Sequence, residues 1–117
     1  LANLHFIRAE AHMFLEALPA QARLAAIFIL FPDPWPKQRH HKHRLMQPRF
    51  FDAVAGRAGQ GVRLCFRTDH EPYFRETEGA LGTHPSWQLM DESWPFETET
   101  VFQQRASSHM SLIASRK

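Results

Sequence analysis

Along the chain, continuous apolar runs alternate with segments whose apolar residues have helical spacing. The run LAAIFILF, residues 24–31, is apolar at every position and stops at Pro-Asp-Pro, which predicts a central parallel strand covered by helices on both faces. GVRLCFRT, residues 61–68, predicts the next strand. Shorter strands are expected at residues 3–10, 87–90 and 110–114.

Three segments between these strands have the spacing and end signals of helices. AHMFLEAL, residues 11–18, is closed by a proline. Residues 44–59 place a proline in the first turn and glycines at the end, and in residues 69–82 Asp69 is a plausible N-cap. The alternation predicts a single α/β domain over residues 1–117, a three-layer sandwich with a mostly parallel sheet.

The composition of the 117 residues, 44% of them hydrophobic, supplies one core of ordinary size. Its single cysteine, Cys65, lies inside an apolar strand and is expected to be a core thiol in a reducing compartment. No apolar run approaches the roughly 20 residues of a membrane helix, and the first residues lack a signal-peptide pattern. We therefore expect a cytoplasmic protein with no membrane association.

Two acidic residues follow directly after predicted strands, Asp33 after residues 24–31 and Asp69 after residues 61–68. Ligands of open α/β sheets bind beyond the carboxyl ends of the strands, so the two carboxylates are expected at one crevice. The prolines on either side of Asp33 restrict the backbone around it and pre-order its carboxylate. The alternative is a turn in which Asp33 binds its own backbone.

A dense run of basic residues follows the acidic turn and predicts contact with the phosphates of a polyanion. It comprises Lys37, Arg39, His40, His41, Lys42, His43 and Arg44. A solvated helix start is the alternative. Zinc is disfavoured, because no cysteine or carboxylate is interleaved at ligand spacing and two of the histidines are adjacent, so we expect no metal. Trp35 could stack on a base, and Tyr73 is expected to pack with its hydroxyl facing the site.

The segments FPDPWPKQRHHKHRL, TDHEPYF and TETVFQQR occur in this order in the chain. They resemble the bacterial tRNA (guanine-N7)-methyltransferase family, whose members carry F-x-D-P-W-x-K-x-R-H-x-K-R-R-L, then T-D with a downstream tyrosine, then T-x-[FY]-E. The first motif is long and specific, and the other two add weight through their order. The resemblance runs from about Asn3 to about Arg105.

The resemblance implies a Rossmann-like class I methyltransferase fold that uses S-adenosylmethionine. In that fold a Gly-rich turn after the first strand and an acid after the second hold the methyl donor. No Gly-rich turn of this kind precedes the first predicted strand here. The chain therefore resembles the C-terminal portion of such a domain, strands three to seven, incomplete at the N-terminus. Weak affinity for S-adenosylmethionine is expected of the chain alone.

The resemblance implies a role for each residue that matches one of the family's motifs. Glu10 and Asp33 are expected to contact the methyl donor, and Asp33 is the expected catalytic residue. The expected substrate-binding residues are Lys37, Asp69, Thr100, Val101, Phe102 and Gln103, and the expected RNA contacts are Arg39, His40, His41, Lys42, His43 and Arg44. His43 stands where the family usually has arginine and Gln103 where it has glutamate, so Gln103 can form hydrogen bonds but cannot balance a positive charge.

The chemistry that the resemblance implies needs no nucleophilic side chain. N7 of guanine already has a lone pair, and its methylation leaves positive charge on the ring that carboxylates stabilise. The expected partner is tRNA, with the methyl group placed on a guanine of its variable loop, and the protein is expected to be a monomer or a homodimer. Two alternatives remain: a non-catalytic RNA-binding remnant without the cofactor site, and an α/β interaction domain.

Overall fold

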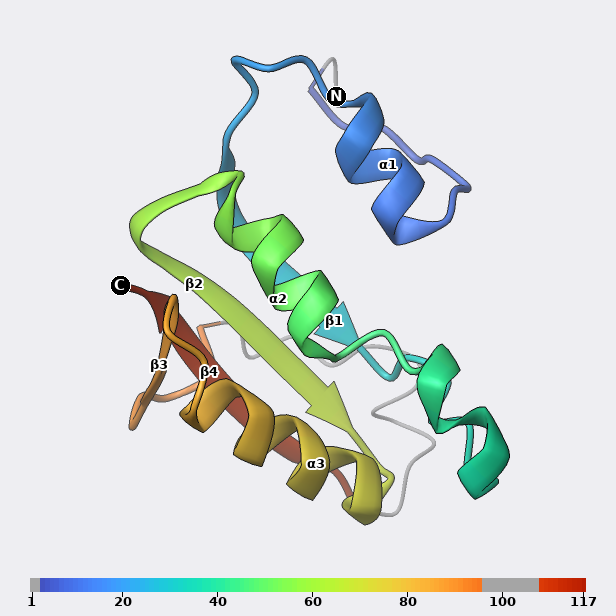
Figure 1. Cartoon of the computed structure of the whole chain (residues 1–117). Helices are drawn as coiled ribbons and strands as arrows, with labels where there is room; N and C mark the ends of the chain where they lie inside the picture. Colours follow the sequence, from blue (N-terminus) through green and yellow to red (C-terminus); the bar gives the residue numbers. More distant parts are fainter. Residues whose placement is uncertain (1–2, 96–107) are drawn as a thin grey trace.

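A computed structural model describes residues 3–95 and 108–117, in which a four-stranded sheet carries helices on one face (Figure 1). In chain order the elements are α1 (Ala11–Ala17), β1 (Leu24–Leu30), the 3-10 helix η1 (Gln38–His43), α2 (Pro48–Ala55), β2 (Ala58–Thr68), α3 (Glu71–Gly82), β3 (Trp87–Met90) and β4 (Met110–Arg116). The three predicted helices and four of the five predicted strands are thus confirmed.

The ends of α2 and α3 follow from their local sequences. Pro48 occupies the first turn of α2, where its missing N–H costs no helical hydrogen bond, and the helix ends at Gly56. The N-cap of α3 is His70 and not Asp69, which corrects the prediction. His70 Nδ1 accepts a hydrogen bond from the Tyr73 N–H at 3.2 Å, the role that an aspartate oxygen would otherwise take.

The strand order is β1-β2-β4-β3, and the sheet is mixed. β1 and β2 run parallel, with Ile27 opposite Leu64. β4 lies antiparallel to β2 and to β3, with Cys65 opposite Ile113. The prediction of a mostly parallel sheet is therefore wrong for the described strands. A short apolar strand such as β4 has no sequence signal for its direction, and its insertion between β2 and β3 reverses two of the three pairings.

Within the described residues, β1 is an edge strand rather than a central one. A strand was predicted at residues 3–10, but these residues contain no strand, and Phe6 is 93% exposed. Leu30 at the end of β1 is 39% exposed as well. An apolar run shows that a strand can be covered on both faces, but it does not reveal which neighbours pair with its edges.

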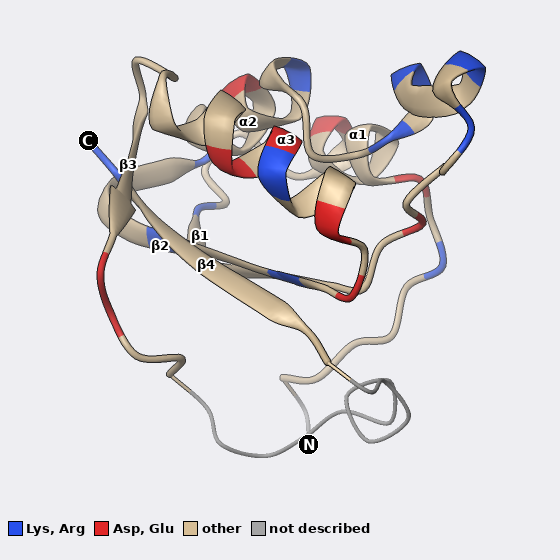
Figure 2. Cartoon of the chain, turned by 90° about the horizontal axis from the view of Figure 1, so that it is seen from below, with Lys and Arg blue, Asp and Glu red and all other residues tan. Residues whose placement is uncertain are grey.

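The described helices all lie on the same face of the sheet (Figure 2). A three-layer sandwich was expected, but on the other face the described covering is a segment without helical structure that follows β3. From this segment Trp94 contributes its ring, which lies 3.9 Å from the guanidinium carbon of Arg67 and 5.9 Å from the Phe28 ring centroid. The sandwich in the described part therefore has a single helical layer.

One hydrophobic core joins the helical layer to the sheet. Phe51 and Val54 of α2 pack with Leu64 and Phe66 of β2. Trp87 of β3 is fully buried in the same cluster, and its indole N–H donates to the Phe51 carbonyl at 3.0 Å. Among the described helices, none is long and apolar enough to cross a membrane.

Candidate functional site

A pocket of about 440 Å³ lies beyond the carboxyl end of β1, where open α/β sheets bind their ligands. The N-terminus of α1, the turn after β1, the end of η1 and the start of α2 all contribute to it. Its lining comprises Glu10, Ala11, His12, Pro32, Asp33, Trp35, Lys42, His43, Arg44, Leu45, Gln47, Arg49 and Phe50. The structure thereby brings together the two residues predicted to contact the methyl donor, Glu10 and Asp33.

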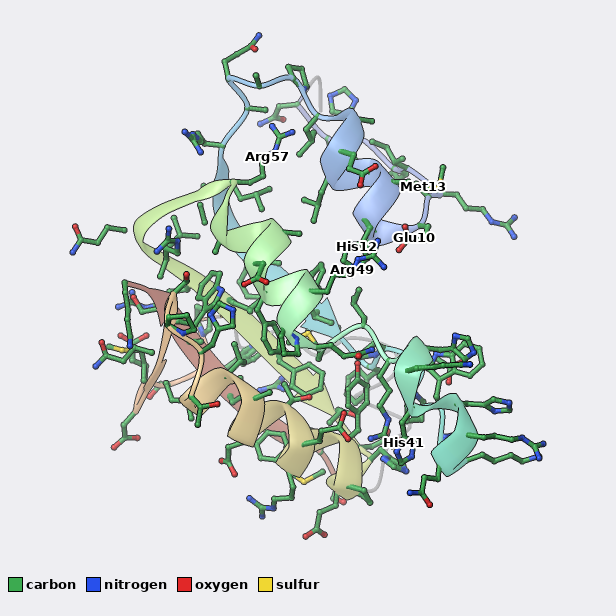
Figure 3. All side chains as sticks on the ribbon, in the orientation of Figure 1. Glu10, His12, Met13, His41, Arg49 and Arg57 are labelled. Carbon is green, nitrogen blue, oxygen red and sulfur yellow. The ribbon has the colours of Figure 1, made fainter. Side chains whose placement is uncertain are left out.

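Glu10 is both a helix cap and a pocket residue. Its two carboxylate oxygens accept hydrogen bonds from the backbone N–H groups of His12, at 3.1 Å, and Met13, at 3.0 Å. These hydrogen bonds lower the pKa of Glu10, and the nearby charges of His12 and Arg49 add to the effect. Figure 3 shows Glu10, His12 and Arg49 close together between α1 and α2. The carboxylate is therefore held ionised at the pocket.

The position of Glu10 depends on a contact that the sequence did not indicate. Arg57, just after α2, donates hydrogen bonds to the carbonyls of Leu15 and Leu18 at the C-terminal end of α1, each at 3.0 Å. A third hydrogen bond reaches the Pro19 carbonyl at 2.6 Å. A cation that binds the last carbonyls of a helix satisfies acceptors that lack helical partners. Arg57 therefore fastens α1 beside α2.

The turn that carries Asp33 is restrained at both of its ends. Phe31 and Trp35 have positive φ angles, 50° and 45°, which residues other than glycine rarely adopt. Asp33 Oδ1 accepts a hydrogen bond from the Trp35 N–H at 3.0 Å. The turn interpretation is confirmed, because Asp33 binds its own backbone. Asp33 also lines the pocket with an exposed carboxylate.

The basic segment forms η1 and the residues around it, and most of its side chains are exposed. Lys37, Arg39, Lys42 and His43 are exposed, whereas His40 and His41 are half-buried. The His43 and His40 rings lie 4.8 and 5.8 Å from the Trp35 ring, so the imidazoles pack around this indole. Figure 2 shows the Lys and Arg positions of η1 at one end of the molecule. This is the rim predicted for phosphate contact, and it lies next to the pocket.

Arg44 departs from the expectation of an RNA contact. Only 1% of its side chain is exposed. Nε donates to the Pro34 carbonyl at 2.6 Å, and Nη1 lies 3.0 Å from Glu76 Oε2. The guanidinium also lies over the ring of Tyr73, 5.0 Å from its centroid. Arg44 is therefore a buried connection between the Asp33 turn and α3, with little surface left for a phosphate.

Asp69 lies at the same edge of the sheet as Asp33, since β1 and β2 are parallel and Leu30 pairs with Arg67. Asp69 is exposed and does not line the pocket that contains Asp33. Tyr73 is fully buried, and its hydroxyl accepts the Met46 N–H at 2.9 Å instead of facing the site. Burial raises the pKa of this phenol. Thr100, Val101, Phe102 and Gln103 lie outside the described residues.

Several pocket residues were not found by sequence reasoning: His12, Gln47, Arg49 and Phe50. They lie in or next to the first turns of α1 and α2, and those two turns meet only in the fold. The sole sequence signal was indirect, because the start of a helix offers free backbone N–H groups near a site. Among residues 3–95 and 108–117, no three histidine, cysteine or acidic side chains are grouped so that they could hold a metal ion.

Comparisons with known proteins show which family the chain resembles. A family described as "Putative methyltransferase" matches residues 1–111. A protein of Streptomyces coelicolor named tRNA (guanine-N(7)-)-methyltransferase is 39% identical over 88 residues, which are 75% of this chain and 32% of the relative. A Bordetella parapertussis protein of the same name is 35% identical over 109 residues, 90% of this chain and 43% of the relative.

The chain thus spans about a third to two fifths of the length of these relatives. A third relative with this name, from Nocardia farcinica, is 44% identical over 71 residues, 61% of this chain and 26% of the relative. The family match covers nearly the whole chain, including the α1 cap, the Asp33 turn and the basic segment. The chain therefore belongs to this family of putative methyltransferases.

Proposed function

We propose that this chain carries the catalytic acid and the RNA-binding rim of a tRNA (guanine-N7)-methyltransferase that uses S-adenosylmethionine. The observation that carries the proposal is the pocket in which Asp33 and Glu10 meet beside the basic segment. The names of the relatives support the reaction and the substrate. We place the chain in the cytoplasm, where tRNA is modified.

The pocket residues fit the methyl donor in their chemistry. S-adenosylmethionine presents hydroxyl and amino donors, and Glu10 and Asp33 present exposed carboxylate acceptors in one pocket. Both Glu10 oxygens accept one backbone N–H each, and Asp33 Oδ1 accepts another. These bonds fix the carboxylates in place without exhausting their acceptor capacity. When bound, the donor supplies an electrophilic methyl group. Strands three to seven of a class I sheet were expected, and the structure describes four strands. We assign these to the last four strands of that sheet, with residues 1–117 as the C-terminal portion of one domain.

The role of the two carboxylates after the strands follows from the substrate. Guanine N7 attacks with a lone pair that carries no proton, so the chain needs no general base. A carboxylate near the base accepts the N1–H and N2–H donors that distinguish guanine, and it stabilises the positive charge that grows on the ring. We assign these tasks to Asp33 and Asp69, which end neighbouring parallel strands. A rigid Asp33 turn keeps the acceptor in place before the base arrives.

The exposed basic side chains serve the RNA backbone. Lys42 lines the pocket, and Lys37 and Arg39 are exposed at the N-cap and in the first turn of η1. We assign all three to phosphates on either side of the target guanine. A guanine engaged in tRNA structure has to leave its stack to reach a pocket, which costs free energy. Phosphate contacts at the rim offset part of this cost.

The experiment measures methyl transfer in a chimera, in which this chain replaces the matching part of the Bordetella parapertussis relative. Labelled S-adenosylmethionine and a tRNA transcript are the substrates, and the position of the methyl group is read from strand cleavage at 7-methylguanine. Asp33→Asn is expected to lower kcat by roughly a hundredfold or more, since it removes a charge that stabilises the transition state. Asp91→Asn, at an exposed position remote from the pocket, is the matched control.

Three results would contradict the proposal or part of it. A chimera that binds tRNA but transfers no methyl group would favour the non-catalytic RNA-binding remnant. Full turnover by the Asp33→Asn chimera would remove Asp33 from the catalytic role. A methyl group on an atom other than N7 would refute the reaction assignment while leaving the methyltransferase family intact.

A further inference from the structure

One peptide group connects Arg44 to Asp33. The carbonyl of the Pro34–Trp35 peptide accepts a hydrogen bond from Arg44 Nε at 2.6 Å. The N–H of the same peptide donates to Asp33 Oδ1 at 3.0 Å. Because a peptide group is planar, the contact that fixes its oxygen also fixes the direction of its N–H. The cation at one end of the peptide also polarises it, which strengthens the N–H as a donor to the carboxylate.

The turn needs such an external restraint because its backbone is strained. Trp35 has a φ of 45°, in the left-handed region that costs energy for any residue with a side chain. Residues in such conformations persist where surrounding contacts hold them. Among the described contacts of this peptide, the one from outside the turn is the hydrogen bond from Arg44.

Arg44 is itself held in place from α3. Its Nη1 lies 3.0 Å from Glu76 Oε2, and its guanidinium lies over the Tyr73 ring. The Tyr73 hydroxyl accepts the Met46 N–H, which fixes the chain two residues beyond Arg44. Nη2 of Arg44 is buried and has no hydrogen-bond partner in the described part of the chain. These contacts keep the side chain in the interior, where only 1% of it is exposed.

We infer that Arg44 is a positioning residue that holds the Asp33 carboxylate through the Pro34–Trp35 peptide, and that it is not a phosphate contact. Only the role of Asp33 in methyl transfer rests on the proposed function. The connection from Arg44 to Asp33 is a property of the free chain.

The first experiment follows the Trp35 backbone amide by NMR in the free 117-residue chain. Arg44→Lys keeps the charge, but a single ammonium group lacks the planar fork that binds Pro34 and Glu76 together. Arg44→Met keeps the length of the side chain and removes every donor. Both variants are expected to shift the Trp35 amide resonance and to speed its hydrogen exchange by roughly fivefold or more, the loss expected for one hydrogen bond.

Two matched variants separate positioning from general loss of stability. Glu76→Gln weakens the contact with α3 but leaves the Arg44–Pro34 hydrogen bond, so a much smaller change at Trp35 is expected. Asp33→Asn changes the acceptor, and adding Arg44→Lys to it is expected to have a smaller effect on the Trp35 amide than Arg44→Lys alone. An unchanged Trp35 amide in both Arg44 variants would overturn the inference. So would equal acceleration of exchange at amides throughout the sheet, which would indicate global opening.

The second experiment uses the methyltransferase chimera. Arg44→Lys is expected to lower kcat with little change in the KM for tRNA, and Arg44→Met is expected to leave the salt dependence of tRNA binding unchanged. Arg39→Met, at an exposed position, is expected to reduce the slope of that salt dependence by about one. A slope reduced equally by Arg44→Met would make Arg44 a phosphate contact and overturn the inference. If the wild-type chimera is inactive, the proposed function fails, while the NMR result on Arg44 stands by itself.

Discussion

His84 Nε2 lies 2.7 Å from Asp52 Oδ1 and joins the turn before β3 to α2. The other ring nitrogen, Nδ1, accepts the Ser86 N–H at 3.0 Å, so it carries no proton in this structure. The proton of the neutral ring is therefore on Nε2, which donates to the carboxylate. The His84 ring also lies edge-on to the ring of Phe51, with 5.9 Å between centroids. The polar contact therefore packs directly against a residue of the hydrophobic core.

The first prediction concerns this histidine. His84→Ala removes the hydrogen bond to Asp52, the bond from Ser86 and a nearly buried ring, so the free energy of unfolding is expected to fall by about 1–3 kcal/mol. Urea denaturation measures the change. Asp52→Asn is expected to cost less, because the Asp52 side chain is 71% exposed and an amide oxygen still accepts from Nε2. Nitrogen NMR of the ring should show the Nε2–H tautomer, and the Nδ1–H form would contradict this assignment.

The second prediction concerns the pH dependence of α1. Backbone N–H groups of His12 and Met13 lower the pKa of Glu10 from its ordinary value of 4.5. A lowered pKa means that the ionised carboxylate stabilises the cap above pH 4.5, and that this stabilisation is lost as the pH falls through the lower, folded-state pKa. The His12 and Met13 amides should therefore lose protection from hydrogen exchange in acid. Glu10→Gln should show no such transition, and an acid transition of equal size in that variant would exclude Glu10 as its cause.

The third prediction concerns Cys65, which is 1% exposed in β2. The pKa of its thiol is raised, mainly because the thiol is buried. Less of the reactive thiolate is therefore present near neutral pH. Alkylation by iodoacetamide at pH 8 is expected to be more than about tenfold slower in the folded chain than in urea. Rapid alkylation of the folded chain would show that the face of the sheet carrying Cys65 opens easily.

The fourth prediction concerns the basic rim and rests on the proposed function. Lys37→Ala combined with Arg39→Ala removes two exposed cations from η1 and its N-cap. Binding of tRNA by the chimera should weaken, and the slope of log K against log salt should fall by about two. The pair Arg23→Ala and Arg116→Ala, at the opposite end of the β1 and β2 strands, removes the same charge. An equal change in slope from this pair would indicate that tRNA binding does not depend specifically on the basic residues of the rim.

Sequence patterns predicted the local elements well because their causes are local. The proline in the first turn of α2 and the glycine after it set the bounds of that helix. A run apolar at every position marks β1 but contains no alternation that would tell its covered face from its open one. For this reason the sequence predicted a central strand where β1 is an edge strand among the described residues, and a strand at residues 3–10 where the described chain has none.

The candidate site shows the same division. The sequence placed Asp33 and the basic run just after a strand, where the structure has a pocket, because a strand end and a charge run are features of neighbouring residues. Arg44 looked like one more cation in that run, and its burial depends on Tyr73 and Glu76, about 30 positions later. Charge and spacing are identical for an exposed and a buried arginine, so only the tertiary contacts distinguish a phosphate ligand from a residue that holds the turn.

The sequence by itself determined the three helices, four of the five predicted strands, the proline-flanked acid and the charge of the basic segment, since each depends on residues close together in the chain. The tertiary structure decided the direction of β4, the meeting of Glu10 with Asp33 in one pocket, and the connection of Arg44 to the Asp33 turn. These features depend on how distant segments pack together, and packing is set by the free energy of the whole chain, which no local pattern contains.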